Sequence, residues 1–173
     1  MGDKLAINWC YFSLEQVNSD QGPKWKVWEQ GPDYTSRGMN AFRAAEAARR
    51  QSEDGFAAFH YAMIMARHED KEDISDISIL TRIAGSVGLD TERFGKDFSD
   101  SNILDRLAKD HTNAVETYGV FGTPTFVFPG DQAAFLKMRP PAPEESLAVF
   151  NEVRTVAEGR GNILEIKRPR KPS

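Results

Sequence analysis

Cys10 is the single cysteine of the 173-residue sequence, and its thiol is the side chain best suited to redox chemistry. One thiol forms neither an intramolecular disulfide nor a multi-thiolate metal site. Thiol–disulfide exchange also needs a second sulfur, which completes the cycle after the first thiolate has attacked. Between Trp9 and Tyr11, Cys10 is expected to pack as a small hydrophobe, and it reacts alone only if it is exposed near a helix N-terminus or a cation. Cys10 is therefore the single candidate for a catalytic residue, and a weak one.

The three histidines do not have the spacing of a metal site. His60 and His68 are eight residues apart, which is not the i, i+4 pairing of a helical zinc site, and His111 lies in another predicted helix. The acidic segment 68–73 is predicted to be a solvated connection between helices. We expect no metal site and no cofactor.

The segment 119–128 contains a Gly-Thr-Pro corner that runs directly into a Thr-Phe-Val-Phe strand. A proline is tolerated at the start of a strand because no ladder donor is required there. An X-Pro bond costs only about 0.5–1 kcal/mol to hold cis, so a proline is the residue that permits such a corner. A trans proline that opens an ordinary strand is the alternative interpretation.

This segment resembles the cis-proline loop of the DsbA family of thioredoxin-like proteins, which includes the FrnE-type oxidoreductases. The resemblance implies that Thr123 offers its backbone to an extended peptide or thiol substrate and that Pro124 follows a cis bond. It thereby assigns Gly122, Thr123, Pro124 and Thr125 to substrate binding. By contrast, Trp25 and Trp28, beside the Gly-Pro turns, either staple a long loop to the core or line a ligand groove.

The sequence predicts a strand, then a block of helices, a hairpin and a last helix. Period-two alternation predicts a strand over 5–12, and 13–33 is irregular. Apolar spacing predicts helices from residue 36, over 54–67, from an N-cap at Asp76 to Gly88, over 90–98 and over 101–118. Strands are predicted over 125–128 and 133–138, joined by a turn at 129–131, and a last helix over 144–157.

This order also resembles the DsbA family, whose thioredoxin core is interrupted by a helical insertion. Residues 12–18, 44–49, 59–62 and 165–169 are similar to segments of one cytosolic, FrnE-like group. The resemblance implies an α/β thioredoxin-like fold, with a core at 1–35 and 101–166, a helical insertion at 36–100, and a basic, disordered tail at 167–173.

In these relatives a first strand, a C-P-x-C motif and a first helix precede the segment that 5–12 resembles. We expect this βα unit to be missing, which would leave an unfilled slot between the strands at 5–12 and 125–128. An upstream extension, a strand from a partner chain, or a homo-oligomer that re-pairs the sheet would fill it. A rival register lays residues 7–11 on C-P-W-C-Y and makes Cys10 a resolving cysteine, but residues 18–23 would break the helix that should follow.

Charge and hydropathy exclude several functional classes. The net charge of −4, with Lys and Arg scattered outside the tail, argues against a nucleic-acid binder. No apolar run is long enough to cross a bilayer, and the start has no signal-peptide pattern. We expect a cytoplasmic protein with no membrane partner.

The resemblance implies a thiol–disulfide oxidoreductase. We expect this chain to be inactive in that reaction, because its sequence contains no CxxC motif. A kappa-class-like glutathione transferase or isomerase and a non-catalytic peptide-binding module are the alternatives. The expected partner in each case is a thiol or peptide substrate at the proline loop.

Overall fold

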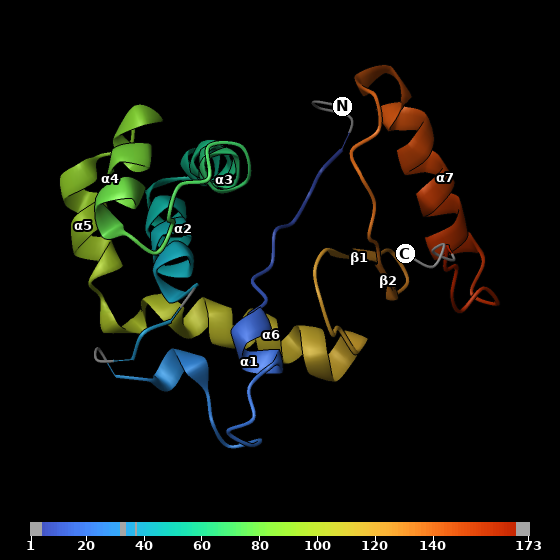
Figure 1. The fold of residues 1–173 in the computed structure, drawn as a ribbon, viewed down its shortest axis with the longest axis horizontal. Coiled ribbons are helices and arrows are strands. Elements are labelled where there is room, and N and C mark those ends of the chain that lie inside the picture. The colour runs from blue at the N-terminus through green and yellow to red at the C-terminus, as the bar shows by residue number, and fades with distance from the viewer. Residues whose placement is uncertain (1–4, 32–33, 37, 169–173) are drawn as a thin grey trace, which may run out of the picture. The chain divides into compact units, whose positions relative to one another are not determined.

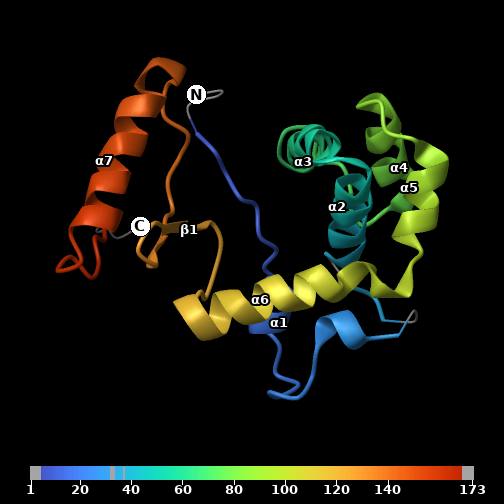
Figure 2. The ribbon, with the colours of Figure 1, turned by 180° about the vertical axis from the view of Figure 1, so that it is seen from behind.

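The computed structural model describes residues 5–31, 34–36 and 38–168, which form two compact units. The first, called here the helical unit, spans residues 10–112. The second, called here the hairpin unit, combines residues 113–168 with residues 5–9. Figures 1 and 2 show the elements from opposite sides.

The helical unit contains most of the helices. They are α1 (Leu14–Val17), the 3₁₀ turn η2 (Val27–Glu29), α2 (Met39–Gln51), α3 (Glu53–His68), α4 (Ile77–Ser86), α5 (Thr91–Phe98), the 3₁₀ turn η3 (Ser101–Leu104) and the first turns of α6 (Asp105–Tyr118). Side chains fix several helix starts: Ser52 accepts from the Gly55 amide, Asp76 from Ser78, and Asp90 from Glu92 and Arg93. The predicted N-cap at Asp76 is thus confirmed.

Small side chains on α2 form the centre of the core. Ala44, Ala45, Ala47 and Ala48 are at most 1% exposed, and α2 packs against α3, α4, α5 and η3. Small residues allow the helix axes to approach closely, so large side chains from the neighbouring helices fill the remaining space. Phe59 and Phe94 are fully buried, with ring centroids 5.6 Å apart.

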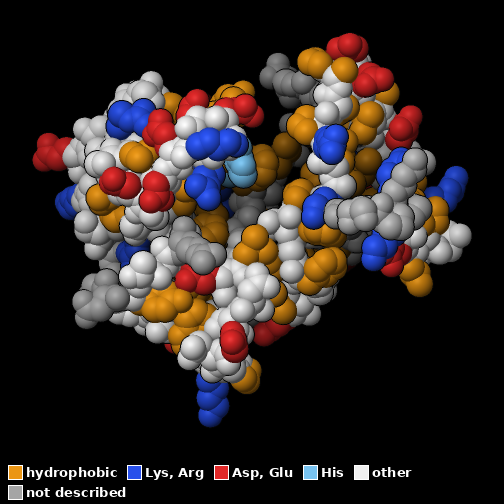
Figure 3. Space-filling view, in the orientation of Figure 1, with side chains coloured by type: hydrophobic (Ala, Val, Ile, Leu, Met, Phe, Trp, Pro, Cys, Tyr) orange, Lys and Arg blue, Asp and Glu red, His pale blue; other side chains and the backbone are white. Residues whose placement is uncertain are grey.

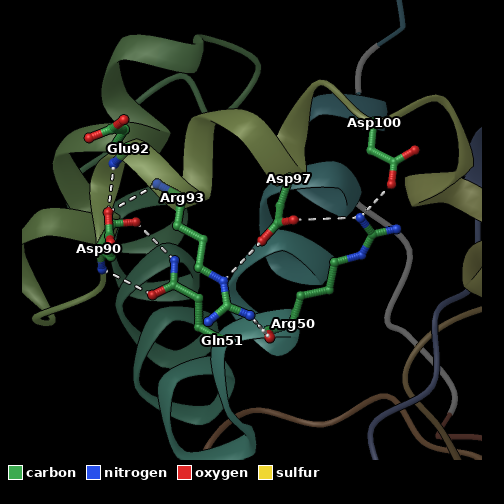
Figure 4. A network of polar contacts seen from close by, with 7 residues as sticks. All are labelled: Arg50, Gln51, Asp90, Glu92, Arg93, Asp97 and Asp100. Atoms are coloured by element: carbon green, nitrogen blue, oxygen red, sulfur yellow. Dashed lines mark hydrogen bonds and ion pairs between the residues drawn. The ribbon is translucent and has the colours of Figure 1, made fainter.

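A polar network fastens the C-terminal end of α2 to α5 and its flanks (Figure 4). Arg50 donates to Asp100 at 2.7 Å and lies 3.7 Å from Asp97. The Gln51 side chain donates to the Asp90 carbonyl at 2.9 Å and accepts the Asp90 amide at 3.0 Å. The Asp90 and Asp100 carboxylates also cap the starts of α5 and η3, so the same two residues fix these helix starts and their packing against α2.

The hairpin unit consists of β1 (Thr125–Phe128), β2 (Gln132–Phe135), the 3₁₀ turn η4 (Pro143–Glu145) and α7 (Ser146–Gly159), together with the last turns of α6. The strands pair antiparallel, with Thr125 opposite Phe135 and Phe128 opposite Gln132, and α7 packs against both. None of the hydrophobic side chains described between 113 and 168 is buried. Figure 3 accordingly shows hydrophobic side chains at the surface of this unit.

Several expectations about elements need correction. The segment 13–33, expected to be irregular, contains α1 and η2, and the helix expected over 144–157 begins with the 3₁₀ turn η4. The described residues of 5–12 form no strand, because the sheet that the structure describes contains only β1 and β2. The second hairpin strand ends at Phe135 rather than 138, since β1 offers only four residues for pairing. The helix expected over 101–118 begins with the 3₁₀ turn η3, where Asp100 caps the Asn102 amide.

The division into core and insertion remains a prediction, and residues 169–173 of the predicted tail lie outside the described residues. No helix in the described part of the chain combines the length and apolarity needed to span a bilayer.

Candidate functional site

The proline corner, Gly122 to Thr125, leads into β1. The Thr123–Pro124 peptide bond is cis. The Pro124 carbonyl accepts the Leu136 amide at 3.0 Å, and the Gly122 carbonyl accepts the Thr125 hydroxyl at 2.7 Å. The carbonyls on both sides of Thr123 are therefore held by neighbouring residues of the same unit.

Thr123 itself offers its backbone to solvent. Thr123 and Pro124 are exposed, whereas Gly122 is buried. Within residues 5–31, 34–36 and 38–168, neither the amide nor the carbonyl of Thr123 has a hydrogen-bond partner. An exposed donor and acceptor on one residue, next to a strand, are the groups with which an extended peptide pairs in β-type recognition.

Two aromatic rings flank the corner. The ring centroids of Phe121 and Phe135 are 5.1 Å apart, and Phe121 is 67% exposed. A Cβ on Gly122 would lie 3.3 Å from Cε2 of Phe135, so the glycine allows this ring to lie close against the corner. The unpaired backbone of Thr123 thus lies beside an apolar surface that a side chain of a bound ligand can cover.

Cys10 is exposed, so the expectation that it packs as a small buried hydrophobe is wrong. The adjacent Tyr11 is only 7% exposed and is anchored by both of its polar groups: its amide donates to Asp110 and its hydroxyl to Glu46, each at 3.1 Å. Cys10 is the last of a run of exposed residues, 6–10, so burial of the segment begins only at Tyr11.

The surroundings of Cys10 disfavour its thiolate. Desolvation and the Asp110 carboxylate raise the pKa of the thiol, and the guanidinium groups of Arg106 and Arg49 offset part of the rise. Arg106 also lies 3.6 Å from Asp110, which reduces its effect on the sulfur. A thiol with a raised pKa is mostly protonated at neutral pH and is a weak nucleophile.

His111 has a structural role inside the helical unit. Its Nδ1 accepts the amide of the buried Ser13 at 3.2 Å. Its ring lies 4.7 Å from that of Phe12 and 5.2 Å from that of Trp28 between centroids. An accepting Nδ1 requires the neutral imidazole, and burial together with Lys26 lowers the pKa of His111, which favours that form.

The other histidines lie on α3. The ring of His60 stacks on Phe56 with centroids 5.3 Å apart, and burial, aided by Arg49, lowers the pKa of His60. His68 is exposed in the last turn. In the part of the chain that the structure describes, no group of three His, Cys, Asp or Glu side chains is placed to hold a metal ion.

The tryptophans fasten the loop that follows α1. Both are partly buried against the core. The Gln16 side chain donates to the Trp25 carbonyl at 2.9 Å and accepts the Val27 amide at 2.8 Å. Trp25 also packs edge-on against Tyr34, with centroids 5.9 Å apart. These contacts agree with the interpretation that the two tryptophans attach the loop to the core.

The structure brings Gly122, Thr123, Pro124 and Thr125 together in the hairpin unit, whereas Cys10 belongs to the helical unit. Sequence reasoning missed Phe135, because its approach to Gly122 follows from the hairpin register. It also missed Asp110, whose link to Tyr11 joins residues 99 positions apart. Phe121 was visible two residues before Thr123 and was not singled out.

Comparison with known proteins gives two findings. Residues 9–148 match the family described as "DSBA-like thioredoxin domain". The chain is also similar to "Uncharacterized protein Rv2286c" of Mycobacterium tuberculosis, with 27% identity over 171 residues that cover 98% of this chain and 71% of the relative. The family match confirms the expected α/β thioredoxin-like fold with a helical insertion. The finer likeness to the FrnE-like group remains a prediction.

Replacing Thr125 by valine tests whether the hydroxyl bond to the Gly122 carbonyl holds the corner. Thr125→Val keeps the branched shape and removes a bond worth about 0.5–1.5 kcal/mol, so protection of the Leu136 amide should fall about two- to tenfold. Hydrogen exchange followed by NMR measures it. Thr123→Val is the matched control, since the exposed Thr123 side chain should leave protection unchanged; equal protection in both variants would mean that the bond contributes nothing.

Alkylation of Cys10 tests the electrostatic surroundings of its sulfur. Because Asp110 raises the pKa of the thiol, Asp110→Asn should lower that pKa, increase the thiolate fraction and speed reaction with iodoacetamide below pH 9. Arg106→Gln should slow the reaction for the opposite reason. Mass spectrometry across a pH series measures both rates, with Asp105→Asn as an exposed control on α6. The same sign of change in both variants would contradict this account.

Proposed function

Because the chain belongs to the DSBA-like thioredoxin domain family, we propose that it docks an extended thiol- or disulfide-bearing peptide at the proline corner and does not complete thiol–disulfide exchange by itself. The family is of the thiol–disulfide oxidoreductase type. On this proposal, the chain supplies a docking backbone for the substrate but only one of the two sulfurs that a complete exchange cycle needs.

The observation that carries the proposal is that Thr123 is exposed and that its amide and carbonyl have no hydrogen-bond partner among the described residues. Its neighbours Gly122 and Pro124 have their carbonyls bonded within the unit, so the corner is held in place without a ligand. A preformed donor and acceptor bind an extended peptide at a smaller ordering cost than a mobile loop. The exposed ring of Phe121 adds apolar contact beside them.

The chemistry of exchange explains why docking alone is proposed. A thiolate attacks one sulfur of a disulfide, a new S–S bond forms, the old one breaks, and the leaving sulfur departs as a thiolate. Release of the resulting mixed disulfide needs a second thiol, and the sequence contains only Cys10. The raised pKa of Cys10 further limits its reactivity as the first nucleophile.

NMR titration tests the docking step. The probe is a short unstructured peptide with a central S-methylcysteine, which mimics a thiol substrate without reacting. We expect a saturable downfield shift of the Thr123 amide and no shifts in α2, α4 and α5. Thr123→Val retains the amide and should bind as the unaltered chain does, whereas Thr123→Pro removes it and should weaken binding about two- to tenfold.

Protection of the Leu136 amide verifies that the corner is intact in both variants. Equal affinity of the two variants, or shifts that avoid residues 121–125, would contradict docking at this backbone. Selective binding of reduced glutathione over the peptide would instead favour a glutathione-dependent function.

An insulin-reduction assay with dithiothreitol tests the catalytic half of the proposal. The chain should not accelerate precipitation above the dithiothreitol background, because its single thiol has a raised pKa and attacks the insulin disulfide no better than dithiothreitol does. Cys10→Ser is the control and should behave identically. Acceleration by the unaltered chain would overturn this half of the proposal without affecting the docking result.

A further inference from the structure

Helix α3 carries hydrophobic residues on both of its faces. Phe56, Phe59, Met63 and Ala66 are buried against the rest of the helical unit. On the opposite face, Tyr61 is 68% exposed, Ile64 37% and Met65 36%. Figures 1 and 2 show α2, α4 and α5 together on one side of α3, which leaves this second face uncovered by the helices of its own unit.

The exposed face is a continuous stripe, called here the outer α3 stripe. It consists of Asp54, Ala57, Ala58, Tyr61, Ile64, Met65 and His68, all of them exposed. Each member has another three or four residues away, and the adjacent pairs 57/58 and 64/65 lie on the two sides of Tyr61, so these side chains form one face of the helix. Large exposed apolar residues scattered singly are ordinary, but a stripe with helical spacing marks an interaction surface.

The stripe is symmetric about Tyr61. Asp54 precedes Tyr61 by seven residues and His68 follows it by seven, which is about two helical turns in each direction. Small residues occupy the N-terminal half, at positions 57 and 58, and large ones the C-terminal half, at 64 and 65. An antiparallel copy of the same helix would therefore set small side chains opposite large ones.

We propose that the outer α3 stripe binds the same stripe of a second copy of this chain, with the two helices antiparallel about a two-fold axis beside Tyr61. A two-fold contact uses one patch twice, so the patch must be complementary to itself. In this arrangement Ala57 faces Met65 of the other copy, and Ala58 faces Ile64. The spacing of three and four residues is that of a two-helix contact with knobs-into-holes packing.

The charged ends of the outer α3 stripe favour the antiparallel direction. Asp54 lies at one end of the outer α3 stripe and His68 at the other; Glu53 already pairs with Arg49 of α2 at 2.8 Å, and Glu69 and Asp70 follow His68. Antiparallel pairing sets Asp54 of one copy beside His68 of the other, whereas parallel pairing would set the two Asp54 carboxylates together. The helix dipoles also oppose each other favourably in the antiparallel arrangement.

The size of the contact sets its expected strength. A helix of 16 residues is about 24 Å long, so two such helices bury less than the roughly 1,200 Å² of a standard stable interface. We therefore expect a weak dimer whose population depends on protein concentration. A central aromatic residue is typical of the few side chains that carry most of the binding energy.

Sedimentation equilibrium of the full chain over a concentration series tests the proposal. We expect a monomer–dimer equilibrium that Tyr61→Glu weakens at least about tenfold, since it places two carboxylates at the two-fold axis. Ile77→Glu is the matched control: Ile77 is 46% exposed at the start of α4 and lies outside the stripe, so the dissociation constant should not change. A monomer at every concentration, or equal effects of the two variants, would overturn the proposal.

Cross-linking tests the antiparallel geometry. In a Cys10→Ser background, Asp54→Cys and His68→Cys chains should be joined by a short bismaleimide when they are mixed, because the two positions face each other across the axis. Neither variant should cross-link to itself. Self-cross-linking at position 54 would show a parallel pair, and a dimer without the mixed cross-link would show that another surface forms it; either result refutes the assignment.

Discussion

The helical unit depends on the close approach of its other helices to α2. Four of its alanines are almost fully buried, and α3, α4, α5 and η3 all pack against this one helix. A larger side chain at these positions would separate the helices that Phe59 and Phe94 join. This packing turns one face of α3 inward and leaves the other to solvent. It therefore defines the core and also the surface that we assign to a second copy.

The hairpin unit is held by a different kind of interaction. Its described hydrophobic side chains are not buried, so local hydrogen bonds determine the geometry of the proline corner. The Thr125 hydroxyl and the Leu136 amide each bond a carbonyl of the corner. The bond between residues 125 and 122 is local, and the bond between 136 and 124 follows from the hairpin register. The corner thus keeps its form even though little apolar area supports it.

Local patterns predicted the helices well and the strands unevenly: the strand expected over 125–128 is confirmed as β1, whereas the other two expected strands are not seen with their predicted bounds. Helical spacing and the N-cap at Asp76 depend on neighbouring residues, and the structure confirms them. A strand depends on a partner: residues 5–12 have the alternation of a strand, but the sheet described in the structure contains only β1 and β2. The same dependence shortens the second strand of the hairpin to the four residues that face β1.

The sequence by itself determined the order of the helices, the turn chemistry of the hairpin, the proline corner and the single cysteine, because each depends on residues close together in the chain. Only the tertiary structure decided which side chains are exposed. Asp110 and Glu46, far from Tyr11 in the chain, hold Tyr11 inward, whereas the neighbouring Cys10 is exposed. The hairpin register bonds the Leu136 amide to Pro124, and the backbone groups of the preceding Thr123 have no partner among the described residues. These outcomes require long-range contacts, which no local pattern of residue types specifies.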